Sequence, residues 1–584
     1  MPAYAIQRWQ SEAAPTKLPD EVVQIIESCS DSTVLGQQKL KAFLLEHGIQ
    51  SISEMDYPLR QAYQNHLLYD QKIRDTGRYI LLYDRIKQAY IREQVKSLKG
   101  RFDCEWRLEE KVLFLPYHHD EKIAMEFDTV RHRPNMVWDF TRDCSWKLKE
   151  QIFTTLNAVI EKFNEPRRRE QRLSGLQSLY DFCIESGVQD IEAMDIQQEQ
   201  AFERYLTEHT SSESRKQQLL PSLSFCRKSV FLQSKEINWN ATVWYLERLH
   251  LPQHRTNPSG SLESISFKEI TMPENRRYAQ EFMKYQLGVT GQAVSTITTR
   301  YILIRHFLTA QSEKHRNVCH CTAETIEGYL NELQERKIIA KTFNEYLSGL
   351  ALFFRFLTVR GYMKKMPFQP EYYQQKVIPQ HHDRSVSPEA CMEMLECIHL
   401  LPEHLRCMYL HLWCLGLRIS EVCTLKGDAY YRQGEDAWIQ VYQIKMKHYK
   451  RIPISDGLHK IMQVYIKRHN IKPDEYLFTN TKGGAYHSAT FRQQMIKFCQ
   501  EQNIEGGEYL FKSHDYRHTV ATHLYDNGVS LQGVRDYLGH DYEEMTQQYI
   551  DYIPRKIAKE STEFFKKPGN SLAACLKKGG KNDR

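Results

Sequence analysis

An internal repeat in the first half of the chain limits its fold more than any other feature of the sequence. Residues 43–52 are echoed by residues 182–191, and the echo continues at one constant offset to Asp56 and Asp195. In each copy an amphipathic helix ends at a glycine, which suits the left-handed position after a helix, and a short connection leads to a second helix. A fainter version without the glycine begins at Tyr301. The first half is therefore predicted to be built from helical pairs.

Two kinds of segment interrupt this helical pattern. Residues 112–115 and 123–127, between the first two copies, are short apolar runs that predict strands. Residues 366–388 contain several prolines, which interrupt helical periodicity. We therefore expect a linker at 366–388 and a separate domain after it.

Length and composition set broad limits. A chain of 584 residues exceeds what one core usually serves, so about two to four domains are expected. The net charge of +6 suits a nucleic-acid partner but is common among proteins without one. No apolar stretch could span a bilayer and the N-terminus lacks signal-peptide features, so a cytoplasmic protein without a membrane partner is expected. The cysteines are mostly isolated, and Cys319-His320-Cys321 favours a loop or helix start over a metal site.

Five residues near the C-terminus carry side chains suited to phosphoryl chemistry. In chain order they are Arg418, His514, Arg517, His540 and Tyr549. Metal-free attack on a phosphodiester needs a nucleophile, positive donors for the nonbridging oxygens and a proton donor for the leaving group. Each residue alone is more typical of a structural role. The ordered set favours catalysis, without a metal or other cofactor.

The segments around the first arginine predict how it is held. Residues 405–415 predict an apolar helix that ends before Arg418, and Glu421 follows one helical turn later, where its carboxylate can orient the guanidinium. Residues 438–444 and 451–454 predict a hairpin with a basic tip. Lys445 is the favoured proton donor among the three lysines of that tip.

Three helices are predicted after the hairpin. Residues 513–527 predict a helix ended by Gly528, and residues 531–538 a second helix ended by Gly539. Asp541, with a glutamate three residues later at position 544, predicts a capping box for a third helix. That cap would leave His540 before the helix and Tyr549 about two turns inside it.

These motifs together resemble the tyrosine recombinase (phage integrase) family. Residues 514–524, then 538–540, then Tyr549 nine positions after His540, match the family's last boxes. Residues 416–421 match its first arginine box, and the hairpin lysine is matched by Lys445. The extra length before about residue 265 is similar to that of large transposon-encoded recombinases and transposases.

The resemblance implies a mainly α fold with a small β-sheet or hairpin in the catalytic domain. A helical core-binding (SAM-like) domain would precede that domain, after an N-terminal extension of helical repeats. The expected divisions are an extension with the first repeat unit at 1–165, a second unit at 166–265, a core-binding domain at 272–370, a catalytic domain at 384–566 and a basic tail at 567–584.

The family also implies roles for the candidate residues. Tyr549 would attack the scissile phosphate and form a 3′-phosphotyrosyl link, without ATP or a metal. Arg418 and Arg517 would bind the nonbridging oxygens, and His540 would hydrogen-bond the phosphate. His514 would assist proton transfer with the tyrosine.

The sequence leaves more than one candidate for the proton donor and for the nucleophile. Lys445 would protonate the leaving oxygen, with Lys447 as a possible substitute because Met446 stands where the family commonly has glycine. Glu421 would orient the Arg418 guanidinium without contacting the phosphate itself. Tyr552, one turn past the favoured tyrosine, could in principle serve as nucleophile, but it lacks the family's spacing.

The expected partner is double-stranded DNA at specific recombination sites. Lys341, Arg355 and Lys447 are candidate DNA contacts. The resemblance implies integration or transposition of a mobile element by a tetramer on paired sites, or by a hetero-assembly with other recombinases of the element. The alternatives are a type IB topoisomerase and a regulatory DNA-binding paralogue.

Overall fold

The computed structural model describes residues 17–29, 33–128, 134–260, 262–378, 384–549 and 561–567. These residues form a mainly α fold with three small antiparallel sheets, as predicted. The chain divides into two compact units, which consist of residues 1–248 with 264–280 and residues 249–263 with 281–584. The finer division into domains stays a prediction.

The first unit contains eleven α-helices and four short strands among its described residues. The helices are α1 (Asp20–Glu27), α2 (Val34–Glu46), α3 (Tyr57–Asn65), α4 (Gly77–Gln94), α5 (Leu98–Cys104), α6 (Glu121–Asp128), α7 (Trp146–Lys162), α8 (Pro166–Glu185), α9 (Ile196–His209), α10 (Glu213–Leu219) and α11 (Pro221–Gln233). The strands are β1 (Val112–Phe114), β2 (Val137–Asp139), β3 (Val243–Tyr245) and β4 (Ser264–Ser266), paired as β1–β2 and β3–β4. Helix α12 (Pro273–Gly288) belongs to both units.

The second unit contains the remaining described helices and a three-stranded sheet in the order β5–β6–β7. The helices are α13 (Val294–Glu313), α14 (Ala323–Glu335), α15 (Ala340–Val359), α16 (Pro388–Cys397), α17 (Glu403–Leu415), α18 (Ile419–Cys423), α19 (Asp456–Arg468), α20 (Ser488–Glu501), α21 (Ser513–Asp526), α22 (Leu531–Leu538) and α23 (Glu543–Gln547). The strands are β5 (Tyr430–Gln433), β6 (Asp436–Gln443) and β7 (His448–Ile454).

The sequence repeat is a repeat of structure. Helices α2 and α8 are followed by Gly48 and Gly187, whose φ angles of 65° and 68° are left-handed, as predicted. A short 3-10 turn follows each glycine, and Asp56 and Asp195 then cap α3 and α9 by accepting backbone N–H groups. The two copies are therefore the helical pairs that the sequence predicts.

A cation from a later helix holds the 3-10 turn in both copies. Lys87 of α4 donates to the carbonyls of Ile52 and Ser53, at 3.1 and 2.8 Å. In the second copy the buried Arg227 of α11 donates to the carbonyls of Ile191 and Met194, at 3.3 and 2.6 Å. In each copy one of the two carbonyls, that of Ile52 or of Ile191, also accepts a backbone N–H within the turn, so the cation adds a second bond to it.

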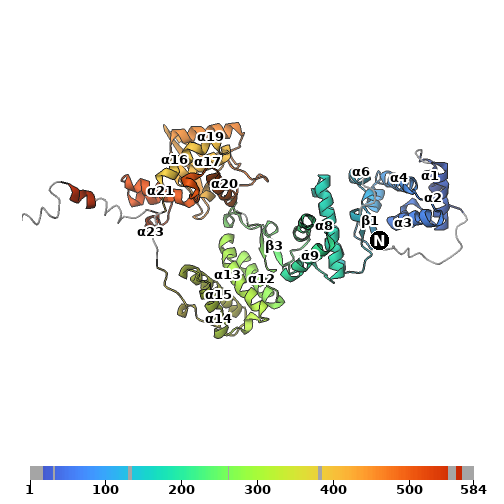
Figure 1. Cartoon of the computed structure of the whole chain (residues 1–584), viewed down its shortest axis with the longest axis horizontal. Helices are drawn as coiled ribbons and strands as arrows, with labels where there is room; N and C mark the ends of the chain where they lie inside the picture. The colour runs from blue at the N-terminus through green and yellow to red at the C-terminus, as the bar shows by residue number, and fades with distance from the viewer. Residues whose placement is uncertain are drawn as a thin grey trace, which may run out of the picture. The chain divides into compact units, whose positions relative to one another are not determined.

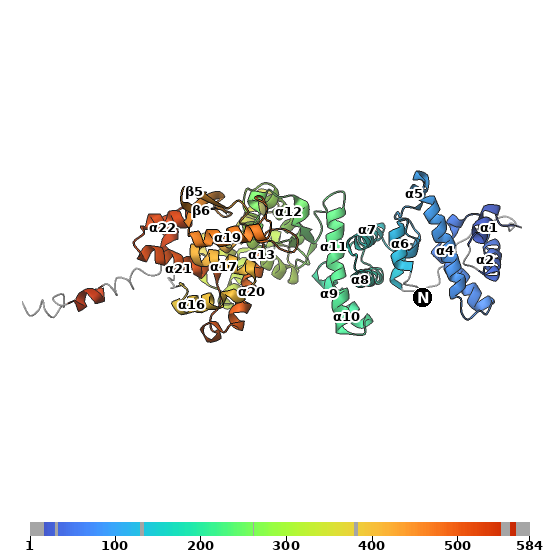
Figure 2. The ribbon, with the colours of Figure 1, turned by 90° about the horizontal axis from the view of Figure 1, so that it is seen from above.

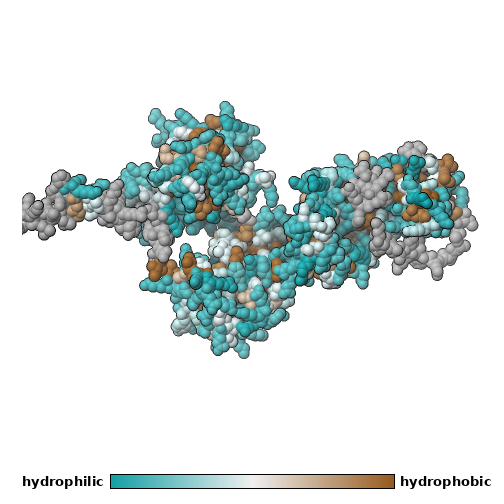
Figure 3. Space-filling view, viewed as in Figure 1, coloured by the Kyte–Doolittle hydropathy of each residue, from teal (hydrophilic) through white to brown (hydrophobic). Residues whose placement is uncertain are grey.

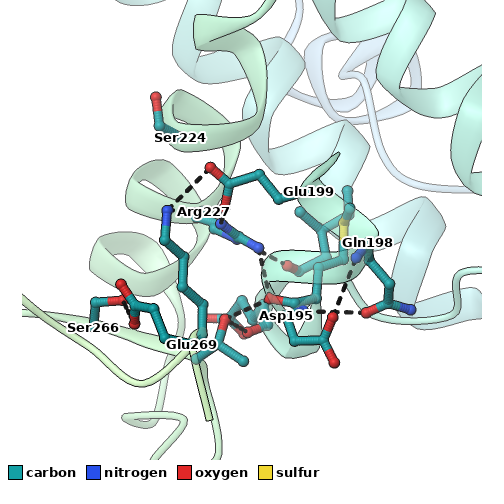
Figure 4. Close-up of polar contacts among 12 residues, drawn as sticks. Asp195, Gln198, Glu199, Ser224, Arg227, Ser266 and Glu269 are labelled. Atoms are coloured by element: carbon teal, nitrogen blue, oxygen red, sulfur yellow. Dashed lines mark hydrogen bonds and ion pairs between the residues drawn. The ribbon is translucent and has the colours of Figure 1, made fainter. Parts of the chain in front are cut away.

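The second copy extends this connection into an ion-pair network. Arg227 also pairs with Glu199 of α9 at 3.1 Å, and Lys268 pairs with the same carboxylate at 3.0 Å. Figure 4 shows Glu199 and Arg227 facing each other beside the capping residues Asp195 and Gln198. All contacts of this network lie within the first unit. They offset the cost of burying the charged Arg227 side chain.

One predicted strand is wrong. Residues 112–115 contain β1 as expected, but residues 123–127 lie within α6. Ala124 and Phe127 are both buried. That i, i+3 spacing puts them on one helical face, which a short run of apolar residues does not distinguish from a strand.

In the part of the second unit after residue 384, helices α18, α19 and α21 pack on α17. Seven side chains of this helix are buried, among them Met408, Tyr409 and Leu412. Figure 1 shows α17 between α16 and α19, with α21 close by, and Figure 2 shows β5 and β6 beside these helices. The apolar helix and the hairpin predicted from the sequence are confirmed, whereas the sequence pattern did not indicate β5.

The visible surface is mostly hydrophilic, as expected for a chain in which hydrophobic residues make up 41% (Figure 3). Figure 3 shows mostly hydrophilic residues on the visible face, with hydrophobic ones scattered among them. In the described part of the chain, none of the helices has both the length and the apolar character that crossing a bilayer requires.

Candidate active site

Arg418 is held by Glu421 at the start of α18. The Arg418 backbone N–H and its Nη1 donate to the two carboxylate oxygens of Glu421, at 3.0 and 2.8 Å. Glu421 is buried, which raises its pKa, but Lys450 and the two arginines lower it more, so the net pKa lies below its ordinary value. The predicted support of Arg418 by an ionised Glu421 is therefore present in the structure.

Arg517 of α21 is fully buried and directs its guanidinium toward two backbone carbonyls. Its Nη1 donates to the Gly416 carbonyl at 2.9 Å and its Nη2 to the Leu538 carbonyl at 2.7 Å. Burial and the nearby Arg418 lower its pKa to about 10, so the group stays charged at neutral pH. Its buried Nε has no hydrogen-bond partner among the described residues.

His540 contacts Arg517 and is neutral. Nη2 of Arg517 donates to Nε2 of His540 at 2.9 Å, and Nδ1 of His540 lies 3.0 Å from Oγ1 of Thr546. Because a guanidinium can only donate, Nε2 is the acceptor and the ring proton lies on Nδ1. Burial and then the cations Arg517 and Arg418 lower the pKa of His540 to about 3.

Tyr549 lies against this group of side chains. Its ring centroid is 4.8 Å from that of His540 and 5.4 Å from Cζ of Arg517. His514 and His518 of α21 lie on the same ring, with centroid distances of 5.1 and 4.6 Å. The structure therefore brings the predicted His514, Arg517, His540 and Tyr549 together.

His518 was not among the residues predicted for the site. It is buried, and its ring stacks on Tyr549 at an interplanar angle of 27°. Its position one turn after His514 on α21 is the sequence signal that could have indicated it. The pKa of the more exposed His514 is lowered to about 4 by partial burial and then by His518 and Arg517.

The predicted start of the last helix is wrong. Asp541 and the glutamate at 544 do not form a capping box, because the N-cap of α23 is Tyr542, which makes no side-chain cap bond. Tyr542 is extended, so the helix begins later and places two glutamates in its first turn, where the helix dipole favours them. Tyr549 follows the C-cap of α23 instead of lying two turns inside the helix.

The lysines of the hairpin tip differ in position. Lys445 and Lys447 are exposed in the turn between β6 and β7, and Lys447 has a left-handed φ of 60°. Lys450 of β7, the third lysine of the tip, is buried and donates to the Leu538 carbonyl at 3.3 Å. Lys450 is therefore the tip lysine that contacts the group around Arg517.

The remaining candidates lie away from this group or outside the described residues. Lys341 and Arg355 are exposed on α15, and Lys341 lines a surface groove with Thr296 and Arg300 of α13. Tyr552 and the tail beyond residue 567 lie outside the described residues. Within the described ranges, no group of three or more His, Cys, Asp or Glu side chains is placed to hold a metal ion.

Comparison with known proteins finds a family model that matches part of the second unit. Residues 385–554 match the model of the phage integrase family. This match covers every residue of the site described above, so this part of the chain is similar to the phage integrase, or tyrosine recombinase, family.

Several individual proteins are similar to this chain. Transposase B from transposon Tn554 of Staphylococcus aureus is 30% identical over 338 residues, which cover 56% of this chain and 54% of the relative. The chain thus matches about half the length of that transposase. A tyrosine recombinase of Pseudothermotoga lettingae is 24% identical over 282 residues, covering 48% of this chain and 95% of the relative. Among solved structures, the Tn1549 transposon integrase in complex with circular intermediate DNA aligns at 19% identity, covering 49% of this chain and 98% of that one, with a TM-score of 0.37.

Proposed function

We propose that the chain is a site-specific DNA recombinase of a mobile element, which cuts and rejoins DNA through a covalent bond between Tyr549 and a 3′-phosphate. The observation that carries this proposal is the position of the Tyr549 ring against the buried Arg517 and His540. The family match of residues 385–554 and the similarity to Transposase B support it.

The arginines would stabilise the charge that develops on the phosphate. Arg517 has a buried Nε with no partner among the described residues, and this donor is available for a nonbridging oxygen. Arg418, with its side chain 13% exposed, is oriented by Glu421 and would donate to the same phosphate. A planar, permanently charged guanidinium suits this task better than a lysine.

The histidines would handle protons and bind the phosphate. His514 is neutral at physiological pH, because its pKa is lowered to about 4, and it can therefore accept the Tyr549 proton. A phosphate oxygen would replace His540 Nε2 as the acceptor for Arg517. His540 would then carry its proton on Nε2 and donate to that oxygen.

The attack transfers the phosphate from the 5′ oxygen of the next nucleotide to the tyrosine oxygen. The departing 5′ oxygen takes a proton from Lys445, or from Lys447 as the alternative, once DNA lies against the hairpin tip. The phosphotyrosyl ester keeps the energy of the broken bond, so that rejoining requires neither ATP nor a metal.

The proposed partner is double-stranded DNA at specific sites, bound in the cytoplasm by a tetramer on paired sites or by a hetero-assembly of related recombinases. Lys341 and Arg355 of α15 are proposed backbone contacts, since phosphate contacts with lysine and arginine position a protein on DNA.

A nicked suicide duplex, built from an end of the mobile element that carries the gene, tests the proposal. The full chain should form a protein–DNA adduct that survives SDS and forms equally in EDTA. Tyr549→Phe should abolish the adduct, whereas Tyr542→Phe, at an exposed tyrosine of the same segment, should retain it. An adduct that persists in Tyr549→Phe would sink the proposal.

A further inference from the structure

Two buried polar side chains of the hairpin have no role in the reaction proposed above. The register pairs Val441 with Lys450 and Gln443 with His448, so Gln443 and Lys450 are diagonal neighbours on one face. That face is otherwise buried and apolar, as at Val441 and Ile452. Gln443 is fully buried and Lys450 is 7% exposed. Burying an amide and an ammonium group is unfavourable unless they are hydrogen-bonded, so their partners indicate their role.

Both side chains reach the same two acceptors. Gln443 Nε2 lies 3.2 Å from Oε1 of Glu421 and 3.2 Å from the Leu538 carbonyl. Lys450 Nζ lies 3.7 Å from Oε2 of Glu421 and 3.3 Å from the same carbonyl. The hairpin therefore joins α18 to the end of α22 through two parallel connections.

Each acceptor holds one side of the site. Glu421 orients Arg418 through two hydrogen bonds. The Leu538 carbonyl accepts the shortest bond of Arg517, at 2.7 Å, and it stands two residues before His540. The hairpin thus links the two groups that hold Arg418 and Arg517.

We infer that Gln443 and Lys450 are positioning residues of the proposed cleavage reaction, which fix the Arg418 side of the site relative to the Arg517 and His540 side. This inference rests on the proposed function. It gives Lys450 a different task from that of the exposed lysines at the tip, because its ammonium group is already engaged by Glu421 and the Leu538 carbonyl.

The backbone at Gly539 fits this arrangement. A Cβ atom added there would lie 2.4 Å from Oε1 and 2.6 Å from Nε2 of Gln443. The glycine between Leu538 and His540 therefore serves two purposes, since it ends α22 with a φ of 68° and leaves room for the Gln443 amide.

Charge also supports the role of Lys450. Burial lowers its pKa to about 8, with Glu421 opposing and Arg517 and Arg418 adding to the decrease. Lys450 is thus still mostly protonated at neutral pH and supplies a cation to Glu421. Replacement by a neutral side chain would leave this carboxylate with fewer partners, although it keeps Arg418 and Gln443.

Cleavage of the nicked duplex by the full chain tests this inference. Lys450→Met and Gln443→Met keep the side-chain volume but remove the donors, and Arg451→Met on the exposed face of the same strand is the matched control. We expect both variants to cleave about 10- to 100-fold more slowly, by analogy with the loss of a partner that orients a metal ligand. DNA affinity should stay close to that of the control, each variant should remain folded at the assay temperature although its thermal stability falls, and Lys450→Arg should recover part of the rate.

A double variant and a modified substrate separate the possible roles. Because the two residues reach the same acceptors in parallel, Gln443→Met with Lys450→Met removes both connections and should be slower than either single variant. A duplex with a bridging 5′ sulfur at the cleavage site has a thiolate leaving group, which needs no proton, and it should not rescue Lys450→Met.

The outcomes distinguish this inference from the proposed function. Control-like rates in both variants would overturn the positioning role, as would a rate decrease that follows loss of folding or of DNA affinity. Rescue of Lys450→Met by the sulfur substrate would make Lys450 the proton donor instead. Absence of an adduct in the unmodified protein would contradict the proposed function itself.

Discussion

Gly539→Ala and Gly528→Ala form a matched pair of substitutions that isolates the contact between Gly539 and the hairpin. Both glycines follow a helix of the second unit in the left-handed region, with φ angles of 68° and 88°. An alanine in this conformation costs about 1–2 kcal/mol at either position. At Gly528 an added Cβ would meet no atom within 4 Å, whereas at Gly539 it would meet the Gln443 amide at 2.4 Å.

The additional cost at Gly539 follows from the hydrogen bonds that Gln443 would lose. Its amide would have to leave the Leu538 carbonyl, a neutral acceptor, and the Glu421 carboxylate, a charged one. A neutral hydrogen bond contributes about 0.5–1.5 kcal/mol and one to a charged group about 1.5–3 kcal/mol. Gly539→Ala should therefore destabilise this region by about 2–4.5 kcal/mol more than Gly528→Ala.

Hydrogen exchange of the full chain, read by mass spectrometry on peptides from β6 and α22, measures this difference locally. A difference of about 2 kcal/mol corresponds to roughly 30-fold faster exchange in Gly539→Ala. Adduct formation should decrease in the same variant and stay near normal in Gly528→Ala. Equal loss of protection in the two variants would show that the contact with Gln443 contributes nothing to stability and would contradict this prediction.

Three further predictions concern individual side chains. Lys445→Ala should form the adduct slowly on a normal duplex and at a near-normal rate on the bridging 5′ sulfur substrate, with Lys447→Ala unaffected on both; the reverse pattern would assign the proton donor to Lys447. Arg517→Lys should reduce cleavage by about 10²- to 10³-fold, the effect of removing one oxyanion donor, and a decrease below tenfold in single-turnover assays would contradict its role. The pKa of His540 is lowered from 6.5 to about 3, so the stability it contributes is complete above pH 6.5 and is lost as the pH falls toward 3. At pH 5 the loss is about 2 kcal/mol, and urea unfolding at pH 8 and pH 5 should show a smaller pH effect in His540→Asn; an unchanged effect would be inconsistent with a neutral buried ring.

The local order of helices and turns in the second unit could be predicted from the sequence. Gly528 and Gly539 follow their helices in the left-handed conformation, and Glu421 pairs with Arg418 one turn away, as predicted. These features depend on residues a few positions apart, and their physical causes are visible in a short window. The ordered motif also indicated which side chains should meet around Tyr549.

Features that depend on tertiary contacts could not be predicted in this way. Residues 123–127 have the same apolar character as a strand, and only the face they bury distinguishes the helix. The start of α23 depends on the extended backbone of Tyr542, not on the acidic residues beside it. Gln443 and Lys450 look like ordinary polar residues of a hairpin, although the alternation along β6 does place Gln443 on the buried face.

Identification of the residue that becomes joined to DNA tests the proposed role of Tyr549. The adduct formed on the nicked duplex is digested with nuclease and trypsin, and the peptide covering residues 536–555 is sequenced by mass spectrometry. This peptide contains Tyr537, Tyr542, Tyr549 and Tyr552, so one experiment compares every candidate in the segment. We expect a nucleotide on Tyr549 alone. A nucleotide on Tyr552, or an unmodified peptide from a protein that still cleaves DNA, would contradict this expectation.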